Sequence, residues 1–153
     1  FESPPVKPLA LSDDGSFLFA VNTPNNRLEI LDTTGPRLTK IKDVPVGLDP
    51  VAVAVQPGTN SNIVWVANMV SDNVSIVDAS AGKVIASVEV GDGPVNIHFS
   101  TDGAFAFVVV QGSPAVPDPL ATPTDNVQEG ALVALNAVAP GSSFPAVPVV
   151  RMP

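Results

Sequence analysis

Residues 49–91 read DPVAVAVQPGTNSNIVWVANMVSDNVSIVDASAGKVIASVEVG, and four short apolar runs follow one another within them. Valine is the commonest residue in these runs, and β-branched side chains favour strands over helices. The dipeptides Asp72-Asn73 and Ala81-Gly82 separate neighbouring runs, and such dipeptides are typical of turns between antiparallel strands. The segment therefore predicts one unit of four short antiparallel strands.

The same unit recurs on both sides of this segment. Ser12-Asp13-Asp14-Gly15 and Ser100-Thr101-Asp102-Gly103 begin 88 positions apart, and Gln56-Pro57-Gly58 lies halfway between them. A period of about 44 residues with four strands is the size of a β-propeller blade. We therefore expect an all-β chain of three four-stranded antiparallel propeller blades that belong to a larger ring. Their expected bounds are 1–48, 49–92 and 93–153.

The third unit is longer because a Pro-rich insertion at about 111–130 separates its second and third strands. A long loop on a rigid scaffold is a usual place for a binding function, although it can also be a tolerated surface excursion or a lid over a neighbouring blade. The polar residues that we take as candidate contacts in this loop are Gln111, Asp118 and Asp125.

The second strands of the units carry a recognisable pattern. Phe19-Ala20-Val21-Asn22 and Trp65-Val66-Ala67-Asn68 are similar to the Tyr-Val-Thr-Asn signature, whereas Phe107-Val108-Val109-Val110 departs from it at the last position. The chain thus resembles the N-terminal portion of the YVTN-type β-propeller repeat family of exported or surface proteins from bacteria and archaea. The resemblance implies further blades in the same polypeptide. We also expect the aromatic Trp65 to pack between blades.

Composition and charge limit the kinds of binding partner that we expect. The 153 residues carry a formal net charge of −8, so we expect no nucleic-acid partner. No apolar run approaches the about 20 residues that span a bilayer, so we expect no membrane insertion. The chain has no Cys, which excludes disulfides and thiolate chemistry within it. It begins with Phe1 rather than Met, and we expect that processing of an exported protein explains this.

Three blades do not close a ring, because propellers need about four to eight. Each blade would bury both faces against neighbours, so an arc of three leaves two apolar faces bare. The expected partners are therefore the remaining blades, from the same polypeptide or from a second copy that would make six in all. We expect a protein partner as well, and an extracellular, cell-surface or periplasmic location.

Few residues are candidates for chemistry. Asp49 and Asp92 lie in the loops that enter the second and third units, and they align once a one-residue shift is allowed. Acids on one rim would attract a cation or a basic partner. His98 is the only histidine, and it stands where the other units have Ala10 and Ala54. A lone histidine supplies no ligand set, so we interpret it as a packed position, with a place in rim binding as the alternative.

No catalytic, cofactor or metal site is predicted from this pattern. The acid-rich turn at Asp14 lacks the alternating acids of a calcium loop, and no phosphate-binding glycine loop or nucleophile elbow occurs. The sequence favours a non-catalytic scaffold or binding module. One alternative is an accessory propeller of a haem- or quinone-linked oxidoreductase whose redox centre lies outside this segment. Another is a lyase or hydrolase that takes its His and acid residues from missing blades.

Overall fold

The computed structural model describes residues 4–59, 62–112, 130–137 and 149–150, and three four-stranded antiparallel sheets account for the strands there. The first sheet consists of β1 (Leu9–Leu11), β2 (Phe17–Asn22), β3 (Arg27–Asp32) and β4 (Thr39–Pro45), with the short 3-10 helix η1 (Thr23–Asn25) between β2 and β3. The second consists of β5 (Pro50–Val55), β6 (Ile63–Asn68), β7 (Asn73–Asp78) and β8 (Lys83–Glu89). The third consists of β9 (Pro94–Phe99), β10 (Phe105–Val110), β11 (Ala131–Asn136) and β12 (Val149–Val150). No helix in these ranges has the length and apolar character to cross a bilayer.

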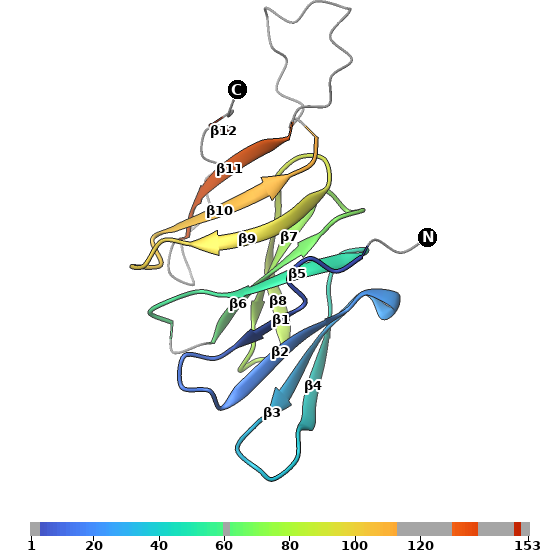
Figure 1. Ribbon diagram of the computed structural model, residues 1–153, viewed down its shortest axis with the longest axis vertical. Coiled ribbons are helices and arrows are strands. Elements are labelled where there is room, and N and C mark those ends of the chain that lie inside the picture. Colours follow the sequence, from blue (N-terminus) through green and yellow to red (C-terminus); the bar gives the residue numbers. More distant parts are fainter. Residues whose placement is uncertain (1–3, 60–61, 113–129, 138–148, 151–153) are drawn as a thin grey trace, which may run out of the picture.

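The sheets stack side by side, and the first strands of successive sheets are neighbours (Figure 1). β1 lies beside β5, and β5 lies beside β9. Lys7, just before β1, forms a parallel bridge to Ala52 of β5, so these two segments run in the same direction. The three first strands therefore form one inner edge, along which equivalent residues of the three units lie at similar heights.

The second sheet is covered on both faces. Every residue of β6 is buried, because alternate side chains of a strand point to opposite faces and each face has a neighbouring sheet. Val64 and Val66 pack with Phe19 of the first sheet. Trp65 packs with the third sheet, where its ring meets Phe99 edge to face at 5.4 Å between ring centres. The expected packing of Trp65 between blades is confirmed.

The flanking sheets are covered on one face only. Ala106, Val108 and Val110 pack against the second sheet, so the other side chains of β10 point away from it. Phe105 is 44% exposed and Val109 is 42% exposed. We call this side, with Phe105, Phe107, Val109 and Leu132, the open face of the third sheet.

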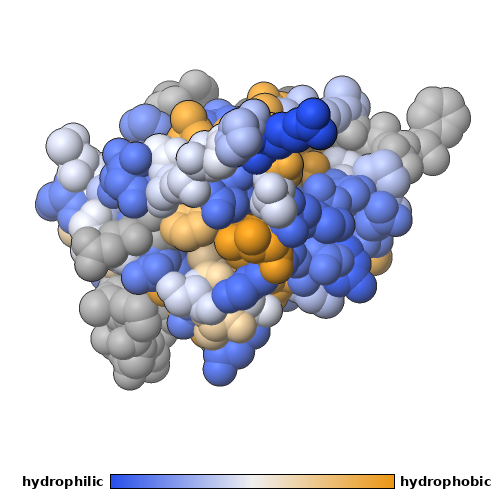
Figure 2. All heavy atoms as spheres, turned by 90° about the horizontal axis from the view of Figure 1, so that it is seen from below, coloured by the Kyte–Doolittle hydropathy of each residue, from blue (hydrophilic) through white to orange (hydrophobic). Residues whose placement is uncertain are grey.

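The first sheet has an open face too, on the side of Leu9, Leu11, Leu18 and Leu31. Leu9 is 53% exposed and Leu11 is 58% exposed. Figure 2 views the molecule from this side and shows apolar residues near the middle, with hydrophilic residues around them. Ion pairs lie on the outer strands of the sheet, at 3.0 Å between Arg27 and Asp43 and at 3.5 Å between Lys40 and Glu29. The apolar part of this face is therefore its inner half.

A buried polar side chain joins the second sheet to the third. The Gln56 side-chain amide donates to the carbonyl oxygens of Gly103 and Ala137, at 3.3 and 3.1 Å, and its oxygen accepts from the Trp65 indole at 3.1 Å. Gln56 is 4% exposed, so loss of these bonds would leave several buried polar groups unpaired. Gln56 thus aligns the turn ends of two neighbouring sheets.

A matched pair of glycines tests this junction. Gly15 and Gly103 occupy the same turn position, with φ of 72° and 69°, so alanine meets similar backbone strain at both. A Cβ on Gly103 would overlap the Pro57 carbonyl oxygen of the second sheet, whereas a Cβ on Gly15 would have nothing within 4 Å. We expect Gly103→Ala to lower the free energy of unfolding by about 1–3 kcal/mol more than Gly15→Ala, as measured by urea denaturation. Equal losses would contradict a close contact between these turns.

Candidate functional site

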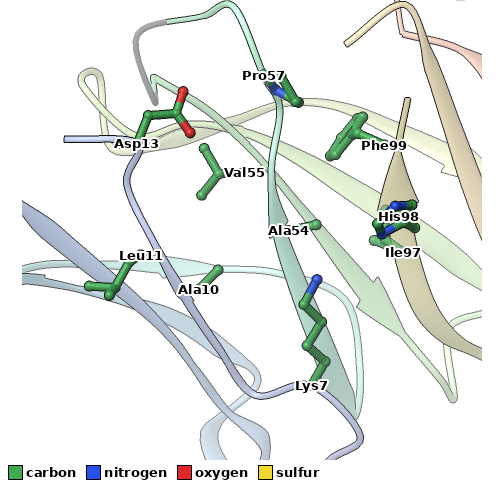
Figure 3. A pocket seen from close by; sticks show the side chains of 10 residues that line it. All are labelled: Lys7, Ala10, Leu11, Asp13, Ala54, Val55, Pro57, Ile97, His98 and Phe99. Atoms are coloured by element: carbon green, nitrogen blue, oxygen red, sulfur yellow. The ribbon is translucent and has the colours of Figure 1, made fainter. Parts of the chain in front are cut away.

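A groove of about 350 Å³ runs along the inner edge, where the first strands of the three sheets converge (Figure 3). Each sheet contributes residues to its walls. The contributions of the strands are Ala10 and Leu11 from β1, Ala54 and Val55 from β5, and Ile97, His98 and Phe99 from β9. Such a concave, mostly apolar surface with a few polar groups is typical of a ligand site.

Two charged residues line opposite ends of this groove. Lys7 precedes β1 and Asp13 follows it, so an extended strand separates them. The backbone N–H groups of Val6 and Lys7 donate to the Val51 carbonyl at 2.9 and 3.2 Å, and the Val53 N–H donates to the Lys7 carbonyl at 2.9 Å. The main chain at Lys7 is therefore tied to the second sheet, which directs its side chain along the groove.

Lys7 is a site residue that our sequence reasoning missed. The signal was available in the repeat, because Lys7 stands where the second and third units have Val51 and Val95. A single cation at a position otherwise filled by valine marks a departure from the repeating pattern. Its side chain forms no hydrogen bond or ion pair within the part of the chain that the structure describes.

His98 lies in the groove and is exposed, which corrects the expectation of a packed position. His98 pairs with Phe107 across β9 and β10, so both residues belong to the open face of the third sheet rather than to the core with Ile97 and Phe99. No sheet within the described residues covers that face. Asp49 and Asp92 lie at the other end of the inner strands, so the structure does not bring them together with His98.

The loops that enter the second and third sheets have the same backbone conformation. The side chain of Asn26 accepts from the Asp49 N–H at 2.8 Å, and the side chain of Asp72 accepts from the Gly93 N–H at 3.0 Å. The four residues share the left-handed backbone, with φ between 54° and 63°. Asp49 is therefore equivalent to Gly93, and it aligns with Asp92 only with the one-residue shift that the repeat requires.

The environment of Asp49 is unusual for a carboxylate. Asp49 is 9% exposed, and its Oδ2 atom is buried without a hydrogen-bond partner among the described residues. The Oδ1 atom of Asn68, a fully buried residue nearby in the β5–β6 pairing, is likewise without a partner there. A buried polar atom without a partner costs about 1–3 kcal/mol, so this junction is less stable than its counterpart at Gly93.

Asp92, in the loop that enters the third sheet, lies close to Gln111, which follows β10. The Gly112 N–H donates to the Asp92 carbonyl at 2.9 Å, and the Gln111 N–H donates to the Gly93 carbonyl at 3.0 Å. Asp92 and Gln111 are both exposed. The structure therefore places Asp92, a rim candidate, close to Gln111, a candidate of the insertion loop. Asp118 and Asp125 lie outside the described residues.

The acids of the strand turns make local bonds. Asp14 accepts from the Ser12 hydroxyl at 2.6 Å, and this bond, followed by those from Ser16, lowers the pKa of Asp14 to about 2. The Ser100 hydroxyl likewise lowers the pKa of Asp102. Within the ranges that the structure describes, no three His, Asp or Glu side chains are grouped so that they could hold a metal ion. The turn acids thus stabilise their own loops.

Comparison with known proteins identifies the architecture. No family model matches the chain, and no curated protein sequence matches it. Hydrazine synthase from Kuenenia stuttgartiensis is similar in structure, with a TM-score of 0.67 and 27% identity over 89% of this chain and 35% of that chain.

Two further solved structures are similar at lower identity. A putative 6-phosphogluconolactonase from Bacteroides uniformis gives a TM-score of 0.71 and 15% identity, over 99% of this chain and 46% of that chain. A functionally unknown protein from Desulfotomaculum acetoxidans gives 0.71 and 16%, over 94% and 41%. The chain thus spans less than half of each of these three chains. Its fold is all-β, with three four-stranded propeller blades that are part of a larger ring, as the repeat predicted.

The equivalence of Asp49 and Gly93 generates a stability prediction. Asp49→Gly removes a buried carboxylate with an unpartnered oxygen and places glycine where the backbone is left-handed, so we expect the free energy of unfolding to rise by about 1 kcal/mol. Asp72→Gly is the control, because Asp72 has the same backbone but accepts a hydrogen bond, and it should give no gain. Thermal or urea denaturation measures both. An Asp49→Gly protein that is less stable than Asp72→Gly would contradict this account of the rim.

Proposed function

We propose that these blades form a non-catalytic scaffold or binding module within a larger propeller. The groove at the inner edge supports this proposal most directly. It is concave and mostly apolar, and the blades hold it on regular strands rather than on loops.

The remaining blades are the first partner in this proposal. Val109 of the open face is equivalent to Ala67, and Phe107 is equivalent to Trp65, both of which are fully buried by the next sheet. A further blade would cover the open face of the third sheet in the same manner. We place these blades in the same polypeptide, in line with the resemblance to the YVTN-type repeat family, and we place the protein outside the cytoplasm, in the periplasm or on the cell surface.

One observation favours a second candidate function. Hydrazine synthase from Kuenenia stuttgartiensis shares 27% sequence identity with this chain, more than the other two solved structures described above. An accessory propeller of an oxidoreductase, with a haem or quinone centre outside these residues, would fit that likeness. The visible absorption spectrum of the full native polypeptide separates the two functions, because a haem gives a strong band and a plain binding module gives none.

Cysteine labelling tests whether a further blade covers the open face. The chain has no Cys, so a single introduced thiol can be followed alone. In the full native polypeptide, we expect Val109→Cys to react about a hundredfold more slowly than Val70→Cys, whose side chain is 61% exposed in a loop. Ala67→Cys is the matched control, since this residue occupies the same place on a face that is already covered.

The outcomes of this experiment are distinct. Labelling of Val109→Cys as fast as Val70→Cys would overturn the proposed covering blade. Protection that disappears on dilution would place the covering blade on a second copy rather than in the same polypeptide. Protection that is independent of concentration supports the proposal as stated.

A further inference from the structure

We propose that the groove at the inner edge binds a small organic anion, namely a carboxylate with an apolar body. This inference rests on the proposed function as a binding module and names the ligand class of its groove. Lys7 would hold the carboxylate, and the apolar walls would hold the hydrocarbon part. Three observations support it, and they concern the origin of the cation, the space beside it and the polarity of the groove.

The fold fixes the position of the cation, Lys7. Lys7 stands where the other units have Val51 and Val95, and its main chain makes hydrogen bonds to Val51 and Val53 of the second sheet. Its Cα is level with Ala52, and Figure 3 shows its side chain extended along β5, with the amine directed toward the part of the groove between Ala54 and His98. An ammonium group that is held in this way, without an acidic partner among the described residues, is suited to an incoming anion.

Small side chains leave space beside the amine. Ala10, Ala54 and His98 are equivalent residues of the three units, and all of them line the groove. The two alanines leave room where a larger side chain would fill the hollow. His98 lines the groove too, but its side chain belongs to the open face of the third sheet, which the proposed further blade would cover.

The groove is polar at its ends and apolar between them. Asp13 lies at the turn end, whereas Lys7 lies at the opposite end of β1. Val55, Pro57 and Phe99 line the part near the turn. An anion is therefore attracted to one end and repelled from the other, and a hydrocarbon chain attached to it would lie along the apolar walls. A single ammonium group suits a monoanion better than a multiply charged phosphate.

Binding of simple probes tests the assignment. Sodium hexanoate supplies a carboxylate with an apolar tail, 1-hexanol supplies the tail without the charge, and inorganic phosphate supplies the charge without the tail. We expect hexanoate to shift the methyl resonances of Ala10 and Ala54 in the full polypeptide, and to bind at least about tenfold more tightly than either other probe. Equal binding of hexanol would overturn the role of the charge, and equal binding of phosphate would overturn the role of the apolar walls.

Substitutions locate the binding groups. Lys7→Met keeps an unbranched side chain of similar length and the main-chain hydrogen bonds, and we expect it to weaken hexanoate binding about tenfold. His98→Ala restores the residue type of the other two units, and we expect it to leave hexanoate binding unchanged, because this side chain belongs to the face that the further blade would cover. Lys83→Met is the control, since Lys83 is an exposed cation on the outer strand β8. Unchanged binding in Lys7→Met, or an equal loss in Lys83→Met, would overturn the proposal.

The anion site and the covering blade can be overturned separately. If no probe binds while Val109→Cys stays protected, the anion site is overturned and the propeller module stands. If Val109→Cys labels freely while hexanoate binds through Lys7, the groove stands and the covering blade is overturned.

Discussion

A sheet with apolar side chains on both faces needs a neighbour on each side, and this requirement shapes the whole molecule. It is satisfied once, at the second sheet, where β6 is buried from end to end between Phe19 on one side and the third sheet on the other. Because hydrophobic burial is the main driving force of folding, the junctions between sheets hold the arc together. The same requirement leaves the outer sheets with exposed Leu9, Leu11, Phe105 and Val109.

The fold could be predicted from the sequence because the same physical pattern occurs three times. Each unit repeats its valine-rich runs and its turn residues in register, so weak signals of single strands add up. The place of Trp65 followed from the same register. β10 ends at Val110 and β11 begins at Ala131, so these two strands flank the Pro-rich stretch. Repetition thus carried the prediction of architecture.

The site could be predicted only in part, because repetition says little about which positions are functional. Asp49 was a candidate rim residue, but its burial and its equivalence to Gly93 depend on backbone conformation that composition does not reveal. His98 was expected to pack, and its exposure depends on which face of the last sheet lacks a neighbour. Lys7 was overlooked, since its role arises from a parallel pairing between two sheets. In each case the residue differs in type from its equivalents in the other units.

The contact between Trp65, Gln56 and Phe99 has a spectroscopic consequence. Trp65 is the only tryptophan of the chain and there is no tyrosine, so the intrinsic fluorescence of these residues comes from one indole. That indole donates to the Gln56 side chain and lies edge-on to Phe99 at the boundary between the second and third sheets. Its emission therefore reports whether these two blades are apposed or have parted, without any added label.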